Sequence, residues 1–467
     1  MEILRVGGLE ADLRRLELRI NPGAEWRPSL TAPPIRQDVP GAAVADEISP
    51  CEGLAISQDV FEAVLREHVR GYDLAEVSTG VELESLEAAD EGADAVLLNR
   101  ATGARSRVRA RYVIAADGAR SPIRQRLGIE MDGPDNLGSQ QMIAFRADLT
   151  AWTGQMPRGI YFLTDRSAAL IWTHPDHRWV LSVPDTTTLG APVASIREAL
   201  GIPDLPVEVL ACCRWTAAAQ TATRYAQGPV FLTGDAAHRF PPAGATGVSA
   251  AMHDVHNLAW KLAYVLTQRA PAALLDTYAH ERETVGRRNA EETGTAWSRV
   301  WNRTGAPFIG RSLRQLDMGY QYQSAIVSAD GSPDADPPGA GYTPTAAPGC
   351  RAPHLWISTP HGRRSTIDLF DQDFVLLTAP PATGWRTAAD AASRTLDVPV
   401  TSQVIAEPEW PGCHSVTPGG AVLVRPDGHV AWRRSALPTA GEPSTETQVR
   451  EALATAIATG AHPATIR

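Results

Sequence analysis

The sequence predicts an α/β fold in which a parallel sheet is interrupted by an antiparallel one and followed by a separate small α/β unit. Two apolar runs, at 111–116 and 230–234, each end at an acidic residue and lead into a helix, which is typical of parallel strands in α/β sheets. Residues 139–184 contain four short apolar or alternating runs with polar turns between them, which favours antiparallel pairing. Residues 328–349 are rich in Pro, Gly, Asp and Ala and form the clearest linker.

The composition is that of a globular protein of two to three domains. The chain has 467 residues, of which 43% are hydrophobic and 21% are charged. Its net charge of −10 is unlike that of nucleic-acid-binding proteins, which usually present a basic face. The longest apolar stretch, around 250–266, includes charged side chains, so we expect no membrane span. Five cysteines without a CxxC pair or metal-finger spacing indicate a reducing, cytoplasmic location.

The other elements follow from periodicity and from capping residues. Apolar side chains in residues 1–20 recur at a helical spacing, and residues 53–70 predict an amphipathic helix capped by Ser57. A helical block is expected from about 249 to 327. Further β-like runs lie at 77–113, at 205–227 and, beyond the linker, around an Asp-Gly turn at 427–428.

The two acid-ended strands predict a ligand site. In open α/β sheets, ligands bind beyond the carboxyl ends of the strands, where Asp235 could accept hydrogen bonds from sugar-like hydroxyls. The Pro- and Gly-rich loop 241–248 lets backbone approach a flat ligand closely. A helix beginning near Ser249, which could cap it, would direct free N–H groups at partial negative charge. Asp117-Gly118 repeats the pattern, with Ser121 capping the next helix, and two such units together favour a ligand over a simple turn.

At these motifs the chain resembles the class A flavoprotein monooxygenases, the group of p-hydroxybenzoate hydroxylase and the aromatic polyketide hydroxylases. The resemblance lies in "AADGARSPIR", in "GDAAHRFPPAGATG" with the following "DVHNLAWKLA", and in "ISQDVFEAVLRE". The tail, from "PGCRAPHLWI" through "LVRPDGHVAWRR", resembles the thioredoxin-like C-terminal domain of the polyketide hydroxylase branch. The resemblance implies a Rossmann-like FAD-binding domain interrupted by an antiparallel β-sheet substrate domain, and then the thioredoxin-like domain.

The expected domain boundaries follow from this resemblance. The first part of the FAD-binding domain is expected at 1–135, the substrate domain at 136–222 and the second part of the FAD-binding domain at 223–327. The linker is expected at 328–349 and the thioredoxin-like domain at 350–467.

The resemblance also implies which residues bind the cofactor. Asp235 would hold the ribityl chain of FAD, Pro242 and Gly244 would lie beside the isoalloxazine, and backbone N–H groups at 247–249 would face its N1–C2=O edge. The full set of expected cofactor-binding residues is Gln58, Asp117, Asp235, Pro242, Gly244, Gly247, Val248 and Ser249, with Arg120 as a weaker candidate. Asn257 and Trp260 would pack behind them. The family usually has P-x-G-G-x-G-x-N here, whereas this chain has Ala245 and Ser249 at the second Gly of the pair and at the Asn.

The function implied is hydroxylation of a polycyclic aromatic, polyketide-derived substrate with NAD(P)H and O2. No side chain stands out as a catalytic acid or base, because the flavin carries the chemistry. Two alternatives stay open: a non-catalytic member of the family that binds an aromatic ligand or a partner subunit, and a Baeyer–Villiger oxidation. A homodimer is compatible with the resemblance.

One family motif is missing. The chain contains no G-x-G-x-x-G, whose glycines let backbone N–H groups reach the pyrophosphate. The opening "MEILRVGGLEADL" resembles a family segment that normally lies downstream of that unit. We therefore expect the chain as written to be truncated, to bind FAD weakly or not at all and to aggregate readily.

Three other patterns allow a second interpretation. His238, His253 and His256 could suggest a metal, but no third-ligand pattern supports one, and we expect none. The C-terminal domain lacks CxxC, so we expect it to act through packing or interfaces and not through redox chemistry. Four tryptophans are equally compatible with an aromatic pocket and with a core: Trp152, Trp172, Trp179 and Trp215.

Overall fold

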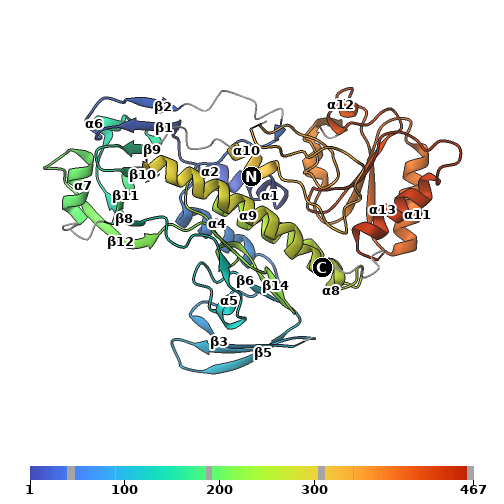
Figure 1. Ribbon diagram of the computed structural model, residues 1–467, viewed down its shortest axis with the longest axis horizontal. Coiled ribbons are helices and arrows are strands. Elements are labelled where there is room, and N and C mark those ends of the chain that lie inside the picture. Colours follow the sequence, from blue (N-terminus) through green and yellow to red (C-terminus); the bar gives the residue numbers. More distant parts are fainter. Residues whose placement is uncertain are drawn as a thin grey trace.

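The computed structural model describes residues 1–38, 48–89, 91–185, 192–302, 311–339, 341–360 and 362–459, so the end of the expected C-terminal domain, 460–467, lies outside the described residues. Figure 1 shows a mainly antiparallel sheet on the left, a central part built from two long helices and a small mixed sheet, and a C-terminal α/β unit on the right. The predicted α/β fold, with an antiparallel sheet inserted between parallel strands, is confirmed.

The largest sheet has seven strands. Their order is β12 (Glu208–Thr216), β8 (Ser139–Arg146), β11 (Arg178–Pro184), β10 (Ala168–His174), β9 (Arg158–Leu163), β1 (Asn21–Arg27) and β2 (Arg36–Asp38). Neighbouring strands are antiparallel except for β1 and β9. Residues 21–38, which the sequence places in the first part of the FAD-binding domain, thus belong to this sheet. One face packs with α7 (Pro192–Leu200) into a core that contains Trp179.

The central part is organised around two parallel strands. The sheet order is β14 (Ala226–Gln227), β15 (Val230–Leu232) and β6 (Val113–Ala115), and β15 and β6 are parallel. The long helices α8 (Thr246–Leu266) and α9 (Ala273–Asn302) pack on it, and Tyr278 of α9 donates a hydrogen bond of 2.6 Å to the Leu232 carbonyl. A second small sheet has the order β16 (His238–Arg239), β13 (Gln220–Ala222) and β7 (Met131–Asp132).

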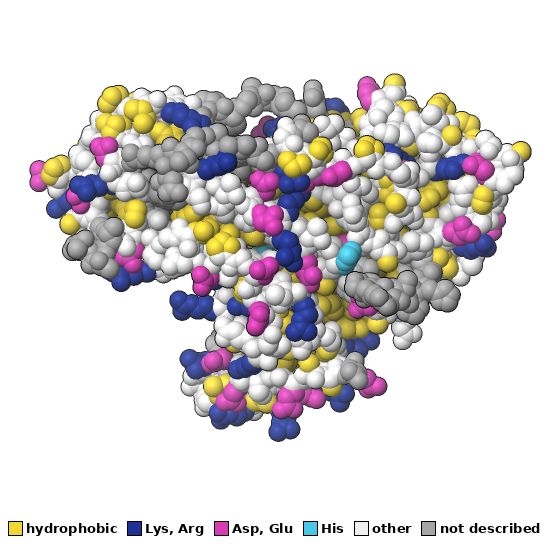
Figure 2. Space-filling view, in the orientation of Figure 1, with side chains coloured by type: hydrophobic (Ala, Val, Ile, Leu, Met, Phe, Trp, Pro, Cys, Tyr) yellow, Lys and Arg dark blue, Asp and Glu magenta, His cyan; other side chains and the backbone are white. Residues whose placement is uncertain are grey.

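A three-stranded antiparallel sheet extends from the central part at the bottom of Figure 1: β3 (Val81–Ala89), β4 (Gly92–Asn99) and β5 (Arg105–Ala110). On the face drawn in Figure 2, basic and acidic side chains are interspersed over this region, where Arg105 pairs with Glu84. The acidic net charge is therefore not gathered into a single patch on that part of this face.

The C-terminal unit has the sheet order β20 (Val400–Val404), β19 (Phe374–Thr378), β21 (Ala421–Val424) and β22 (Val430–Arg434). Only β19 and β20 are parallel, and α11 (Thr383–Leu396) connects them, while α13 (Thr445–Ala456) packs beside α11. This arrangement confirms the thioredoxin-like fold. The unit packs on α8, where Trp260 and Tyr264 each meet the Phe374 ring edge-on at 5.8 Å, so Trp260 is a packing residue as expected.

The remaining elements are short or peripheral. Helix α4 (Gln58–Arg70) begins directly after Ser57, the predicted capping position, although the Ser57 side chain makes no capping hydrogen bond. The others are α1 (Glu2–Val6), α2 (Glu10–Arg15), α5 (Pro122–Arg126), α6 (Thr150–Thr153), α10 (Leu313–Met318), α12 (Trp410–His414), η1 (Gly234–Ala236), η2 (Thr366–Leu369), β17 (Trp356–Thr359) and β18 (Gly362–Ser365). None of the described helices is both long enough and apolar enough to cross a membrane.

Candidate functional site

The two acid-ended strands lie side by side. Strand β6 pairs with β15 in parallel, with Ala115 opposite Leu232, and the Thr233 N–H donates to the Ala115 carbonyl at 3.1 Å. Both strands therefore end at the same edge of the sheet, and Asp117 and Asp235 lie within three residues of those ends. This is the edge at which open α/β sheets bind ligands.

Asp117 is engaged by its own helix. Its Oδ2 accepts a hydrogen bond of 3.0 Å from the Ile123 N–H, and Ser121 Oγ accepts one from the Arg124 N–H, which confirms Ser121 as the cap of α5. The buried Arg124 guanidinium donates to the carbonyls of Ala236 (3.0 Å) and Ala119 (3.2 Å). Burial lowers the pKa of Arg124, and the positive charge of Arg239 lowers it further. Arg124 thus ties together the loops that follow β6 and β15.

Helix α8 begins earlier than predicted. Its first residue is Thr246, so Ser249 lies inside the first turn and does not cap the helix. The capping position belongs to Ala245, which has the left-handed conformation (φ 53°) that normally favours glycine and costs a residue with a Cβ about 1–2 kcal/mol. The free N–H groups at this helix end are consequently those of Thr246, Gly247 and Val248, one residue earlier than the predicted 247–249.

A buried carboxylate on α8 holds the loop that contains Asp235. Asp254 Oδ2 accepts a hydrogen bond from the Gly234 N–H (3.0 Å) and lies 2.8 Å from His238 Nε2, while Oδ1 accepts one from Arg282 Nε (2.7 Å). Burial alone would raise the pKa of Asp254, but His238 and Arg282 lower it to about 2, so the side chain is a carboxylate at neutral pH. The backbone next to Asp235 is thereby fixed from inside the protein.

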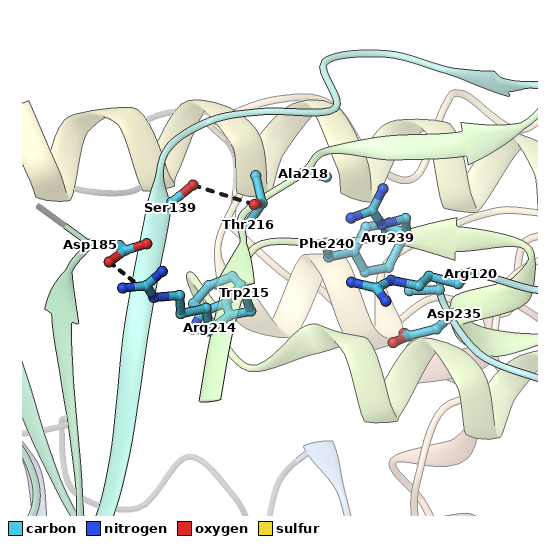
Figure 3. Close-up of a pocket in the computed structure, with 11 residues that line it drawn as sticks. Arg120, Ser139, Asp185, Arg214, Trp215, Thr216, Ala218, Asp235, Arg239 and Phe240 are labelled. Carbon is cyan, nitrogen blue, oxygen red and sulfur yellow. Dashed lines mark hydrogen bonds and ion pairs between the residues drawn. The ribbon is translucent and has the colours of Figure 1, made fainter. Parts of the chain in front are cut away.

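A cavity of about 590 Å³ opens beside Asp235 and reaches the end of the seven-stranded sheet. In Figure 3, Asp235, Arg120, Arg239 and Phe240 gather at one end of it, and a second group lies at the other end. That second group comprises Ser139, Asp185, Arg214, Trp215 and Thr216. The cavity therefore joins the ligand-binding edge of the parallel sheet to the antiparallel sheet.

The charges around the cavity are uneven. Arg214 lies 3.4 Å from Asp185, whereas Arg239 donates to the neutral Gln220 side chain at 2.9 Å. Asp235 is exposed and makes no hydrogen bond or ion pair with any other residue in the described ranges. A carboxylate that is held in place by its backbone but has no protein partner is available to a ligand.

The other predicted cofactor-binding residues fall into two groups. Pro242, Gly244, Gly247, Val248 and Ser249 form the loop and first turn of α8, as expected from their spacing, although none of them lines the cavity beside Asp235. Gln58 is elsewhere: it is exposed in the first turn of α4, does not line the cavity, and donates a hydrogen bond of 2.7 Å to Glu62. Its contact with the cofactor stays a prediction, as does that of Asp117.

The tertiary structure separates the four tryptophans. Trp179 is buried in the core of the seven-stranded sheet, and Trp152 and Trp172 pack against that core. Only Trp215 lines the cavity, where its ring meets Trp297 edge-on at 5.7 Å. Of the four tryptophans, only Trp215 is placed to contact an aromatic ligand in the cavity.

The histidines do not form a common site. His238 faces Asp254 and stacks on Phe240 at 4.5 Å, whereas His253 contacts the Tyr320 ring. In the described parts of the chain, no three His, Cys, Asp or Glu side chains are placed to hold a metal ion.

Four residues that line the cavity were not identified from the sequence. Arg239, Phe240, Asp185 and Arg214 were not predicted to line the site, because residues far apart in the sequence converge there. Asp254 could have been identified from the sequence, because Asp254, Asn257 and Lys261 follow each other at helical spacing in a mainly apolar stretch.

The residues present fit the ribityl and ring portion of FAD. Asp235 supplies an unpaired acceptor, the α8 N-terminus supplies free N–H groups, and Thr246 Oγ1 is buried without a hydrogen-bond partner in the described structure. At Gly247 an added Cβ would meet nothing within 4 Å, so open space adjoins the helix end. Donors, an acceptor and free space suit a flat ligand that carries hydroxyls and partial negative charge.

Comparison with known proteins agrees with this geometry. Residues 1–293 match the family described as "FAD binding domain", and residues 345–459 match "Aromatic-ring hydroxylase, C-terminal". The chain is 35% identical to tetracenomycin B2 monooxygenase-dioxygenase of Streptomyces olivaceus over 93% of this chain and 86% of that protein. It is 36% identical to a putative polyketide hydroxylase of Streptomyces halstedii over 98% of this chain and 89% of that protein.

The structure is also similar to a solved ternary complex of aklavinone-11 hydroxylase with FAD and aklavinone. The TM-score is 0.88 at 29% identity, over 98% of this chain and 90% of that one. The family models cover most of the sequence, and the relatives are more than 30% identical to it. The solved complex has the same fold, which is consistent with a ligand site at the end of the parallel strands β6 and β15. The chain therefore belongs to the FAD-binding aromatic-ring hydroxylases, the class A flavoprotein monooxygenases.

Proposed function

We propose that this protein is a FAD-dependent monooxygenase that hydroxylates a polycyclic aromatic polyketide with NAD(P)H and O2. The observation that carries the proposal is the cavity, which connects Asp235 at one end with Trp215 at the other. A cofactor held at the Asp235 end and an aromatic substrate held at the Trp215 end would share one continuous cavity. The relative named as a putative polyketide hydroxylase supports the substrate class.

The second face of the seven-stranded sheet supplies a surface for a flat apolar substrate. The strand register places Ile160, Ile171, Val180 and Ala144 in one row across β9, β10, β11 and β8. These side chains are only half-buried, while the residues that alternate with them form the core. Gln140, Met142 and Ala144 alternate along β8, so their side chains lie on the same face of the sheet. Trp215 of β12 pairs with Gln140 and therefore lies on that face as well.

The protein's own part in the reaction is to bind and orient. Asp235 would accept a hydrogen bond from a ribityl hydroxyl of FAD, and the N–H groups of Thr246, Gly247 and Val248 would stabilise negative charge at the edge of the ring system. FAD would supply the electron transfer from NAD(P)H and the activation of O2. The apolar sheet face excludes water around the substrate. Five free cysteines support a reducing, cytoplasmic setting for this activity.

The test is substrate-dependent oxygen transfer by the purified protein supplied with excess FAD, because weak FAD binding is expected of a chain without G-x-G-x-x-G. Adding a polycyclic phenol should stimulate oxidation of NADH or NADPH and produce a ring-intact product that carries one oxygen atom from labelled O2. A lactone product would indicate Baeyer–Villiger oxidation instead. Binding of the phenol without any oxygen uptake would contradict the proposal and favour a non-catalytic member of the family.

We expect Gly247→Ala to weaken FAD binding without destabilising the protein. The new methyl group meets no protein atom within 4 Å, and Ala favours a helix over Gly by about 1 kcal/mol, so the melting temperature should be unchanged or slightly raised. The methyl group would occupy the space against which the cofactor edge packs, so Kd for FAD should rise about tenfold, or about 1.4 kcal/mol. Gly384→Ala, at the same second position of α11, is the matched control and should leave Kd unchanged.

We expect the cysteines of the C-terminal unit to be dispensable. Burial raises the pKa of Cys350 to about 12 and that of Cys413 to about 11, so neither is a thiolate at neutral pH. The double variant Cys350→Ala/Cys413→Ala should oxidise NADPH at a rate within about twofold of the wild type. A large loss of turnover in a folded variant would show that this unit takes part in the chemistry.

A further inference from the structure

Polar side chains on one face of α8 contact successive residues of α9. Asp254, Asn257 and Lys261 follow each other at helical spacing, and all three are buried. On α9, Arg282 binds Asp254, and the preceding Glu281 binds Lys261 and Asn257. Asp254, which binds Arg282, also accepts the Gly234 N–H from the loop that carries Asp235. Glu281, which binds Lys261 and Asn257, also binds Arg425 of the C-terminal unit.

The second contact is part of what we call the interdomain ion cluster, formed by Lys261, Glu281, Arg425 and Asp427. Lys261 Nζ lies 2.8 Å from Glu281 Oε2, and the Arg425 guanidinium donates to both Glu281 oxygens at 2.7 and 3.0 Å. Arg425 Nε also donates to Asp427 Oδ1 at 2.9 Å. The side chains of these four residues are at most 1% exposed.

This cluster has two cations and two carboxylates, so its charges balance. Arg425 and Asp427 come from the turn between β21 and β22, whereas the other two residues belong to α8 and α9. A balanced buried cluster contributes little stability beyond what apolar packing would give, because desolvation offsets the attraction between the charges. Stability alone therefore does not explain its place between the C-terminal unit and α8.

Tyr322 connects this cluster to the loop of Asp235. Its hydroxyl accepts a hydrogen bond of 3.1 Å from Arg282 Nη1, and its ring lies 5.2 Å from the Arg425 guanidinium. Arg282 in turn binds Asp254, which accepts the Gly234 N–H. An unbroken series of buried contacts thus leads from the C-terminal unit to the residue before Asp235.

We propose that Tyr322 and Arg425 are positioning residues for FAD, through which the C-terminal unit keeps Gly234 and Asp235 in place at the end of β15. The proposal rests on the placement of FAD at Asp235 given above. It assigns to the C-terminal unit a role in cofactor binding that needs neither a thiol nor a contact with FAD.

The test is a double-mutant cycle on FAD affinity, measured by quenching of flavin fluorescence. Tyr322→Phe removes the hydrogen bond with Arg282 and leaves every charge paired, so the variant should fold. Its Kd for FAD should rise about three- to tenfold. In the Asp235→Ala background the same substitution should change Kd by less than about twofold, because the group being positioned is gone.

Tyr342→Phe is the matched control. Like Tyr322, Tyr342 accepts a hydrogen bond from a buried arginine. Its donor is Arg351 Nη1 of the C-terminal unit, at 3.2 Å, and Arg351 binds Glu2 and not α8. Both variants should lose similar thermal stability, and only Tyr322→Phe should weaken FAD binding. The proposal is overturned if the two variants have equal Kd values, or if Tyr322→Phe and Asp235→Ala act additively. An unchanged Kd in Asp235→Ala alone would separately refute the placement of FAD.

Discussion

Replacing Glu281 with alanine is expected to lower the free energy of unfolding by about 3–5 kcal/mol, the cost of breaking a buried ion pair. Glu281 accepts hydrogen bonds from Arg425, Lys261, Asn257 (2.7 Å) and Ser324 (2.6 Å), and all of these lose their acceptor together. Burial alone would raise the pKa of Glu281, but Arg425 and Lys261 lower it below its usual range, so the removed group is charged. Urea denaturation followed by tryptophan fluorescence measures the loss.

Two further variants separate charge imbalance from lost packing. Glu281→Leu combined with Lys261→Met removes one charge of each sign and leaves Arg425 paired with Asp427, so the double variant should be more stable than Glu281→Ala. Glu62→Ala removes an exposed carboxylate, 2.7 Å from Arg66, and should change stability by less than about 0.5 kcal/mol. Equal destabilisation by Glu281→Ala and Glu62→Ala would contradict this account of the cluster.

Asp235→Ala is expected to weaken FAD binding tenfold or more. A charge-assisted hydrogen bond contributes about 1.5–3 kcal/mol, and each 1.4 kcal/mol corresponds to a factor of ten in Kd. Asp235 has no partner among the described residues, so its removal should leave the melting temperature unchanged. Fluorescence titration with FAD measures the affinity, and thermal denaturation of the protein without FAD measures the stability.

Two controls sharpen the comparison. Asp235→Asn keeps an oxygen acceptor without the charge, so its Kd should lie between those of the wild type and Asp235→Ala. Asp73→Ala removes another exposed carboxylate, three residues after the end of α4 and not among the residues that line the cavity, and should leave Kd unchanged. If a folded Asp235→Ala variant bound FAD as tightly as the wild type, the ribityl contact would be assigned to the wrong residue.

The thioredoxin-like character of the C-terminal unit followed from the resemblance to the family. Residue patterns alone predict the fold class, the antiparallel insertion, a separate small α/β unit at the C-terminus and the place of Asp235 at the end of a strand. These features are encoded locally: a strand alternates every two residues, and an acidic residue at its end lies at the sheet edge wherever the strand is placed. Ser121 was predictable for the same reason, because its hydroxyl binds an N–H three residues away.

The first residue of α8 and the choice of tryptophan that faces the cavity depend on how the elements pack together. Ala245 closes the turn in a left-handed conformation that its residue type disfavours, so the local preference for a cap at Ser249 does not apply. Trp179 and Trp215 have equivalent sequence signals, and only the packing of whole sheets makes one a core residue and the other a wall of the cavity.

The same distinction explains the buried network behind Asp235. Asp254 could be identified from the sequence as polar on an apolar helix, but not its partners, because Gly234 and Arg282 lie 20 and 28 residues away. Arg425 is 144 residues from Glu281. Contacts across such separations depend on how the complete units pack, and no local spacing in the chain encodes them.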